Sequence, residues 1–300
     1  MPTPKPIANY EDLCGEAPLW DVERNCLYWA DSLGLKFYRY NWASMKSEVV
    51  KDGLEINGCA LSVKGGFVIT NNSGIWFWDG AHRLRLVADL VDGAECRMND
   101  CIADPKGRVL AGSWFYDPGK DYPLGKLICV DTDNSTRILD EGFHLSNGLG
   151  FSPDGKTLYF ADSAIRIIFA YDYDIAQGTV KNRRVFARIS DDEGIPDGLT
   201  VDAEGYVWSA QWYGSCVVRY DPDGKIERRL HVPAKQTSSL AFGGPDLTDI
   251  FITSAAQSEP MPVMPIGYDS GSGYFGGALF HVNLGIVGKP EFKANILLSP

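Results

Sequence analysis

A short apolar segment, a polar turn and a second apolar segment recur six times along the chain, at a spacing of about 45 residues. The six units open on Glu16, Gly58, Asn99, Asn147, Asp197 and Ser238. Most units continue into a third apolar run and a fourth, more polar one, which is typical of four-stranded antiparallel sheets. A strand-built repeat of this length predicts an all-β protein, a six-bladed β-propeller of four-stranded antiparallel blades.

The predicted ring takes in the whole chain. We expect residues 1–300 to form a single β-propeller domain, because no linker or shift in composition divides them. The segment Pro6–Tyr10 precedes the first unit and is expected to add a strand to the last blade, which closes the ring. The first strand of each propeller blade lines the central channel, so the residues that open the units are expected to meet at one mouth of that channel.

Charge and composition limit the class of partner. The net charge of −11 argues against nucleic acids and anionic membranes, which both require a positive face. No uncharged apolar run is long enough to span a membrane, and the first residues lack the apolar stretch of a secretory signal. Seven cysteines without a Cys-x-x-Cys spacing indicate free thiols in a reducing compartment. We therefore expect a cytoplasmic protein.

Two glycine-rich segments imitate nucleotide-binding motifs. Residues Gly150–Thr157 match the phosphate-loop pattern, but the apolar run that follows is β-like, whereas phosphate binding requires a helix there. The same Asp/Gly turn recurs in other units, so we expect a hairpin turn. Residues Gly271–Gly276 lead into a predicted strand and are rejected as a dinucleotide fingerprint for the same reason.

Four of the six opening residues carry side-chain oxygens: Glu16, Asn99, Asn147 and Asp197. Two carboxylates balance the charge of a divalent cation, and two amides add neutral oxygen ligands. A set without His or Cys suits hard cations such as Ca²⁺, Mg²⁺ or Mn²⁺. The alternative is that these residues only cap the entries of strands, as Asx residues do in many turns. Their matching positions in different units favour a metal site.

Five short motifs carry a resemblance to a known family. They are Gly15–Trp20 (GEAPLW), Arg97–Asp100 (RMND), Ser146–Leu149 (SNGL), Pro196–Leu199 (PDGL) and Phe242–Gly244 (FGG). Together they resemble the regucalcin (senescence marker protein)/gluconolactonase family of six-bladed, metal-dependent lactonases. The resemblance extends over nearly the whole chain.

The resemblance implies an enzyme that hydrolyses lactone esters (EC 3.1.1.-). It implies that Glu16, Asn147 and Asp197 hold one divalent metal ion, with Ca²⁺ expected first and Mn²⁺, Mg²⁺ or Zn²⁺ as alternatives. It further implies that Arg97 and Asn99 contact the substrate or a water on the metal. The hypothesis is Lewis-acid activation of the carbonyl of a sugar lactone and attack of water, with Asp197 as the general base.

Two segments depart from the family pattern. Residues 114–122 are rich in aromatics, and residues 256–276 form a long connection where the family commonly has a short one. Both are expected near the channel mouth, where the substrate is selected. They keep two alternatives open: a related hydrolase of organophosphates or aromatic lactones, and a non-catalytic calcium-binding propeller. The particular small-molecule lactone and the oligomeric state stay open as well.

Overall fold

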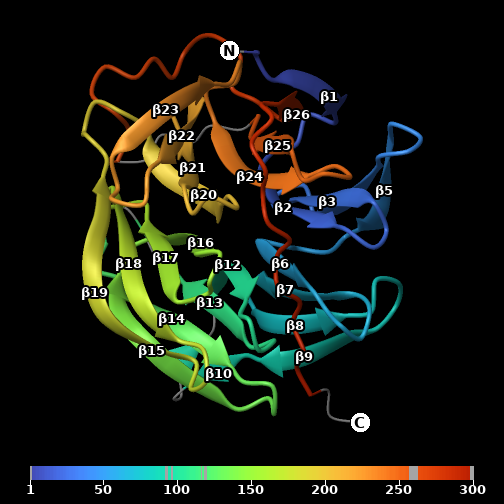
Figure 1. The fold of residues 1–300 in the computed structure, drawn as a ribbon, viewed down its shortest axis with the longest axis vertical. Helices are drawn as coiled ribbons and strands as arrows, with labels where there is room; N and C mark the ends of the chain where they lie inside the picture. The colour runs from blue at the N-terminus through green and yellow to red at the C-terminus, as the bar shows by residue number, and fades with distance from the viewer. Residues whose placement is uncertain are drawn as a thin grey trace.

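Six four-stranded antiparallel sheets are arranged in a ring around a central axis in the computed structural model (Figure 1). The structure describes residues 2–91, 94–95, 97–115, 117, 120–256 and 263–297. Every regular element in this part of the chain is a β-strand, and no helix there could cross a membrane. The predicted six-bladed β-propeller is therefore confirmed.

Blades 1 to 5 are each built from four strands that follow one another in the sequence, with the first strand innermost. Blade 1 contains β2 (Gly15–Asp21), β3 (Cys26–Asp31), β4 (Lys36–Asn41) and β5 (Lys46–Asp52). Blade 2 contains β6 (Gly58–Leu61), β7 (Phe67–Asn71), β8 (Gly74–Trp78) and β9 (Leu84–Ala88). Blade 3 contains β12 (Met98–Ala103), β13 (Val109–Ser113), β14 (Gly125–Val130) and β15 (Thr136–Phe143).

The next two blades repeat this order. Blade 4 contains β16 (Ser146–Phe151), β17 (Thr157–Asp162), β18 (Ile167–Asp174) and β19 (Thr179–Arg188). Blade 5 contains β20 (Ile195–Val201), β21 (Val207–Trp212), β22 (Cys216–Tyr220) and β23 (Ile226–His231). A separate two-stranded ribbon, β10 (Leu90–Val91) and β11 (Ala94–Glu95), precedes blade 3.

Blade 6 joins segments from opposite ends of the chain. It contains β24 (Thr237–Gly243), β25 (Asp249–Ser254), β26 (Ala278–Asn283) and, as its outermost strand, β1 (Lys5–Asn9). Strand β1 is antiparallel to β26, with Lys5 opposite His281. The strand expected from Pro6–Tyr10 is therefore confirmed, and it closes the ring.

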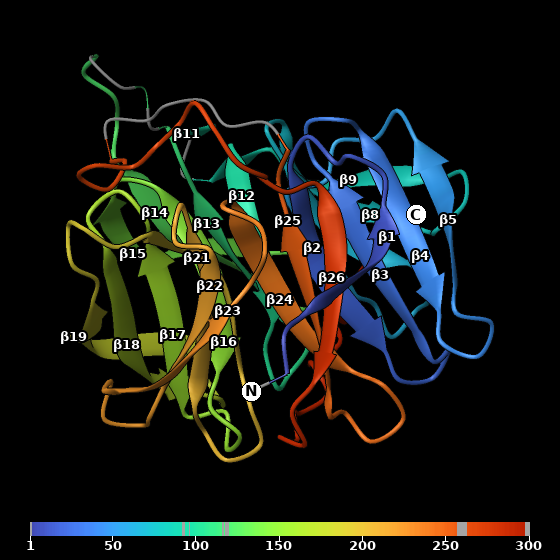
Figure 2. The same cartoon turned by 90° about the horizontal axis from the view of Figure 1, so that it is seen from above.

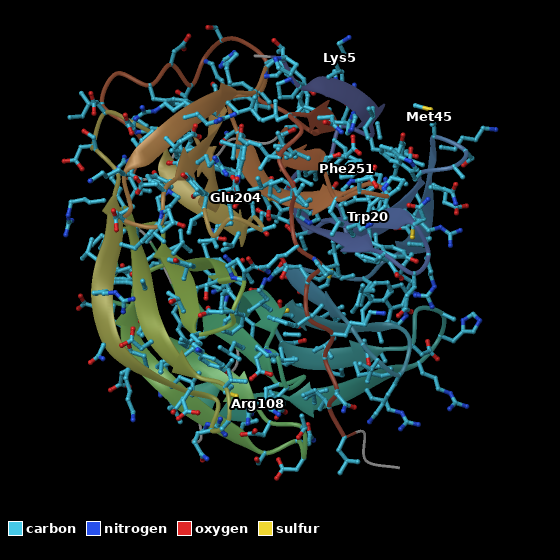
Figure 3. The ribbon with its side chains drawn as sticks, viewed as in Figure 1. Lys5, Trp20, Met45, Arg108, Glu204 and Phe251 are labelled. Carbon is cyan, nitrogen blue, oxygen red and sulfur yellow. The ribbon has the colours of Figure 1, made fainter. Side chains whose placement is uncertain are left out.

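Aromatic and aliphatic side chains fill the space between neighbouring blades. Between blades 1 and 6, the rings of Trp20 and Phe251 are stacked with their centroids 5.6 Å apart (Figure 3). Both side chains belong to one buried cluster that draws residues from both blades. Burial of a large apolar side chain contributes about 1.5–3 kcal/mol, so contacts of this kind hold each blade to the next.

The segment after β26 crosses one face of the ring, which we call the floor (Figure 1). Its backbone bonds to blade 5 through Ala203 N to Val287 O (2.9 Å) and to blade 2 through Ala294 N to Leu61 O (2.7 Å). Ala294 is fully buried in the apolar cluster between blades 2 and 3. We call residues 284–297 the C-terminal strap, because they tie several blades together at the ends of their innermost strands.

The connections after β13 and β25 lie on the opposite face, which we call the mouth (Figure 2). Arg166 is buried there and donates hydrogen bonds to the carbonyl oxygens of Glu193 (2.8 Å) and Val263 (2.6 Å). It thus fastens the long connection of blade 6 over blade 5. Of the two segments that depart from the family pattern, residues 116, 118–119 and 257–262 lie outside the described residues.

The look-alike phosphate loop is a hairpin turn between β16 and β17. Gly155 adopts a φ of 69°, and its N–H donates to Ser152 O at 2.8 Å. A strand follows at Thr157, so no helix N-terminus is available for a phosphate. The interpretation as a turn is confirmed. The described cysteines are all free thiols, as expected.

Candidate functional site

Bulges in the innermost strands direct the predicted site residues into the channel mouth. The strand register shifts between Glu16 and Leu19 in β2 and between Ser146 and Leu149 in β16. Strands β12, β20 and β24 carry the same irregularity at the equivalent positions. A bulge adds a residue to one strand and turns its side chain out of the regular alternation. The repeat therefore supplies the same local distortion several times around one axis.

Glycine follows two of these residues because the inner strands converge. A Cβ atom on Gly148 would lie 2.4 Å from Leu199 N, and one on Gly198 would lie 2.0 Å from Ser239 Oγ. Any other residue type would push the neighbouring blade away. The Asn-Gly and Asp-Gly pairs thus combine an oxygen donor with the close approach that brings the blades together.

Three carboxylates from different blades lie near enough to one another at the mouth for their charges to interact. Burial and the nearby charges of Asp197 and Asp100 raise the pKa of Glu16 well above its usual range. Burial and the charge of Asp100 likewise raise the pKa of Asp197, whose side chain is only 4% exposed. No described Lys or Arg forms an ion pair with any of the three. Acidic groups without a basic partner are therefore concentrated at this point, and burial together with their mutual repulsion disfavours their charged forms.

Two asparagine amides are held so that their oxygens remain available. The Nδ2 of Asn147 donates to Ser163 Oγ (3.2 Å), and its side chain is also hydrogen-bonded to Asp197. The Nδ2 of Asn99 donates to Ser146 O (2.8 Å). In both residues the amide nitrogen is used by the protein, and no described donor binds the Oδ1 atom. Each Oδ1 can accept a hydrogen bond or coordinate a cation.

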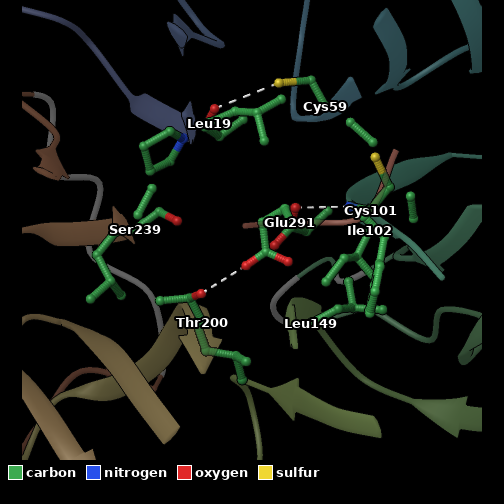
Figure 4. Close-up of a pocket in the computed structure, with 17 residues that line it drawn as sticks. Leu19, Cys59, Cys101, Ile102, Leu149, Thr200, Ser239 and Glu291 are labelled. Carbon is green, nitrogen blue, oxygen red and sulfur yellow. Dashed lines mark hydrogen bonds between the residues drawn. The ribbon is translucent and has the colours of Figure 1, made fainter. Parts of the chain in front are cut away.

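A small cavity of about 60 Å³ lies among the innermost strands of the six blades (Figure 4). Asp100 and Glu291 line it, and Glu291 enters from the C-terminal strap. The Oγ1 of Thr200 donates to Glu291 Oε1 (3.0 Å), and Lys289 Nζ pairs with Glu291 Oε2 (3.0 Å). Burial raises the pKa of Asp100 to about 7, and the charge of Glu291 adds to this effect. Acidic groups therefore extend along the channel from mouth to floor.

Arg97 lies at the mouth between blades 2 and 3. Its Nε donates to Asn72 Oδ1 (3.0 Å), and its guanidinium lies 4.2 Å from the ring centroid of Trp114. The side-chain amide of Asn72 in turn donates to Glu55. The structure records no contact between Arg97 and the three carboxylates. The structure therefore places Glu16, Asn147 and Asp197 near one another, whereas Arg97 lies on another part of the rim.

The donor set fits a hard divalent cation. Buried carboxylates that repel each other would be relieved by a dication, and the Oδ1 of Asn147 adds a neutral ligand. Among the described residues, no group of three or more His, Cys, Asp or Glu side chains is arranged to hold a metal ion by itself. The amide of Asn147 is accordingly needed to complete the protein part of such a site.

Several residues of the site were not singled out in the sequence. Asp100 directly follows Asn99 in the RMND motif, and the bulge in β12 could have indicated that both residues face the channel. Asn72 lies in a turn with no motif of its own, whereas Trp114 opens the aromatic segment 114–122 that was expected near the mouth. Glu291 lies outside the repeat, so no sequence pattern points to it.

Comparison of the sequence with known proteins finds a matching family and similar lactonases. The family model described as "SMP-30/Gluconolactonase/LRE-like region" matches residues 14–256. Pentonolactonase XacC of Haloferax volcanii is 34% identical over 287 residues, which cover 95% of this chain and 96% of that protein. The 6-deoxy-6-sulfogluconolactonase of Pseudomonas putida is 34% identical over 260 residues, covering 85% and 88% of the two chains.

A solved structure shows the same architecture. The regucalcin of Agrobacterium tumefaciens, described as a calcium-binding protein, superposes with a TM-score of 0.84 and 26% identity. The superposition covers 99% of this chain and 100% of the other.

Proposed function

The chain belongs to the SMP-30/gluconolactonase/LRE-like family, and we propose from this premise that it is a metal-dependent hydrolase that opens a sugar lactone. Relatives named lactonases are hydrolases of lactone esters, which supports the class EC 3.1.1.-. The observation that carries the proposal is that Glu16, Asp100 and Asp197 lie near one another and near the Asn147 amide at the channel mouth, where no described Lys or Arg pairs with these carboxylates. Such a set is suited to a metal ion and a small polar substrate.

Glu16, Asn147 and Asp197 are the proposed ligands of one divalent ion, Ca²⁺ in the first place. Its chemistry, when it is bound, is that of a Lewis acid for the lactone carbonyl. The description of the related regucalcin as calcium-binding supports the choice of ion. Mn²⁺, Mg²⁺ and Zn²⁺ are the alternatives to be compared in the same assay.

The protein residues take separate parts in the reaction. Asp197 is the proposed general base, which accepts a proton from the attacking water as the water adds to the carbonyl carbon. Collapse of the tetrahedral intermediate breaks the ring C–O bond, and the ring oxygen takes up the proton held by Asp197, which yields the hydroxy acid and restores the base. Asn99, with its Nδ2 bound to Ser146 O, presents Oδ1 to a substrate hydroxyl or to the water. Arg97 binds substrate oxygens from the other part of the rim.

A lactone panel tests the proposal. Acid release is followed with aldonolactones, aryl lactones and an organophosphate, before and after treatment with EDTA and after Ca²⁺ is restored. We expect hydrolysis of an aldonolactone that EDTA abolishes and Ca²⁺ recovers. Activity toward the aryl or phosphorus esters alone favours the related hydrolase, and calcium binding without any activity favours the non-catalytic propeller.

Asp197→Ala provides the residue-level test. We expect it to abolish hydrolysis and to weaken Ca²⁺ binding measured by calorimetry, whereas Asp172→Ala on the outer half of blade 4 leaves both unchanged. Asp172 is exposed and pairs only with outer-strand side chains. An Asp197→Ala protein that retains both the metal and the wild-type rate contradicts the assignment.

A further inference from the structure

A cavity of about 330 Å³ lies at the mouth end of blade 5. It is lined by residues 192–194 before β20, by residues within 211–218 of β21 and β22, by Arg229 of β23, and by residues 265–268 of the long connection in blade 6. None of the proposed metal ligands lines it. Its volume falls in the range of about 300–1,000 Å³ that is typical of small-molecule sites. The cavity is therefore a second candidate site in the same molecule.

Hydrogen bonds hold the roof of this cavity, residues 265–268, in place. The guanidinium of Arg166 donates to Val263 O at 2.6 Å, just before the roof begins. Within the roof, Ile266 N donates to Asp191 O at 3.3 Å. The roof belongs to the long connection of blade 6, which is one of the two segments that depart from the family pattern. The cavity is thus preformed, and it depends on a part of the chain that lies outside the repeat.

Two tyrosines contribute aromatic surface to the cavity. The ring centroids of Tyr213 and Tyr268 are 4.7 Å apart, and the ring planes meet at 64°. Tyr213 is buried and Tyr268 is half-buried. Rings packed edge to face are fixed in orientation and present flat apolar faces. Such faces suit a ligand ring with C–H groups on one side, as in a sugar, and they suit an aromatic ring as well.

Charged side chains make up the polar part of the lining. Arg229 Nη2 lies 2.5 Å from Glu193 Oε1, and both side chains are partly exposed. Asp192 also lines the cavity, and its carboxylate accepts a hydrogen bond from Ser190 Oγ. The cavity therefore offers donors from a guanidinium and acceptors from two carboxylates, without an excess of positive charge.

The two parts of the lining together distinguish between classes of ligand. An aromatic or aliphatic ligand would remove water from Arg229, Glu193 and Asp192 without replacing the lost hydrogen bonds, which opposes binding. An anion would be repelled by the two carboxylates, and a cation would compete with Arg229 for Glu193. A neutral sugar ring suits both parts, because its hydroxyls bond to the charged groups while its C–H groups pack on the tyrosines.

The cavity begins close to the proposed general base. Gly194 lines the cavity, and Asp197 follows it by three residues. Three residues of extended chain span at most about 11 Å, so the Cα atoms of Gly194 and Asp197 lie within that distance. Two linked sugar rings can bridge such a separation. If one ring lies at the proposed metal ligands, a second ring linked to it reaches the cavity.

We propose that the cavity at blade 5 binds a neutral sugar ring, the second ring of a lactone that is derived from a disaccharide. This inference rests on the proposed lactonase function and narrows its substrate class. Tyr268 and Arg229 are the residues that contact the second ring.

The kinetic experiment compares maltobionolactone and cellobionolactone, which differ in their linkage, with gluconolactone at saturating Ca²⁺. The readout is the ratio of kcat/KM for each disaccharide lactone to kcat/KM for gluconolactone. For the wild type, we expect a ratio of about ten or more for at least one linkage. Tyr268→Ala and Arg229→Gln are each expected to lower this ratio by about tenfold.

Matched variants control for general effects of these substitutions. Tyr274→Ala removes an exposed tyrosine from the same connection, and Tyr274 does not line the cavity. Arg228→Gln removes the same charge from the neighbouring position of β23, whose side chain faces the opposite side of the strand. Both controls should keep the wild-type ratio. Equal ratios in all four variants overturn the inference.

Filling the cavity tests it without removing a polar group that binds the sugar. Cys216 lines the cavity and is partly exposed, so Cys216→Phe places a phenyl ring in the space of the ligand. We expect this variant to lose the binding of maltose or cellobiose that calorimetry measures for the wild type. Thermal unfolding checks that the variant is folded, and Tyr268→Ala is measured in the same way. Undiminished sugar binding in both variants contradicts the assignment of the cavity.

Sugar binding without a lactone separates this inference from the proposed function, because maltose and cellobiose cannot be hydrolysed as lactones. If no lactone is hydrolysed but a disaccharide binds and Tyr268→Ala abolishes the binding, the lactonase proposal fails and the sugar site stands. If lactones are hydrolysed but neither disaccharide binds and neither disaccharide lactone is preferred, the sugar site fails and the lactonase proposal stands. Binding of phenol in place of both sugars overturns the assigned class of ligand.

Discussion

Asp197 raises the pKa of Glu16 through its charge, although the two residues belong to the innermost strands of different blades. The metal-free protein therefore holds a buried carboxyl group, Asp197, and a half-buried one, Glu16, that disfavour each other's charged form. This relationship connects the stability of the ring to the occupancy of the site, because a cation that binds only the folded state stabilises it.

Glu16→Gln is expected to stabilise the metal-free protein and to weaken its response to Ca²⁺. The amide removes the repulsion with Asp197 while its volume is retained, so the melting temperature in EDTA should rise above that of the wild type. The wild type should gain about 2.7 kcal/mol at a Ca²⁺ concentration one hundred times its Kd, and the variant clearly less. Thermal unfolding with EDTA and with Ca²⁺ measures both effects. An undiminished calcium response in the variant would exclude Glu16 as a ligand.

Asp100→Asn should lower the affinity for Ca²⁺ without removing a proposed ligand. The charge of Asp100 acts on both Glu16 and Asp197, so its loss reduces the negative potential at the mouth. We expect calorimetry to show Ca²⁺ binding that is weaker by about tenfold. Asp223→Asn in an exposed turn of blade 5 is the matched control. An unchanged calcium affinity in Asp100→Asn would show that the charge of Asp100 does not affect calcium binding.

Ser163→Ala tests how the amide of Asn147 is oriented. Ser163 Oγ accepts from Asn147 and donates to Pro196 O at 2.6 Å, so it connects blades 4 and 5 behind the site. Its loss should destabilise the protein by about 1–3 kcal/mol and also reduce Ca²⁺ affinity.

Ser254→Ala in blade 6 is the control for that measurement. Its hydroxyl is buried and donates to Ala278 O at 2.7 Å, away from Asn147. We expect a comparable loss of stability but an unchanged calcium Kd. Parallel losses of affinity in the two variants would indicate general loosening rather than an effect on Asn147.

Asp12→Asn should make the stability less dependent on pH. Burial raises the pKa of Asp12 from 3.8 to about 7, although Trp29 Nε1 donates to its carboxylate at 3.0 Å. Because the folded-state pKa is raised, the wild type loses stability as the pH rises from about 4 through about 7, on the order of 4 kcal/mol. The amide cannot ionise, so the variant should lose less stability over this range. Denaturant unfolding at several pH values checks this, and an unchanged pH profile would contradict it.

The repeat could be predicted from the sequence because it is a local pattern of apolar segments and turns. The candidate site residues could be predicted with it, because each of them opens one unit of the repeat. Glu16, Asn147 and Asp197 occupy equivalent bulges in their blades. The period of the repeat was therefore enough to predict that they lie near one another. Their roles as ligands remain predictions. Glu291 could not be predicted, since its position depends on tertiary bonds between the C-terminal strap and the floor rather than on the repeat. The orientation of Arg97 likewise depends on two connections that lie far apart in the sequence.

The pairing of β1 with β26 has a consequence for biosynthesis. Blade 6 needs β1, which precedes all other strands, and three strands that follow the other five blades, so the ring stays open until β26 has been synthesised. During that time β1 has no partner and the exposed sides of the first and last completed blades can meet other chains. A nascent chain stalled before β26 should therefore depend on chaperones. In the closed ring, the pairing of β1 with β26 leaves no terminal blade that can unfold separately.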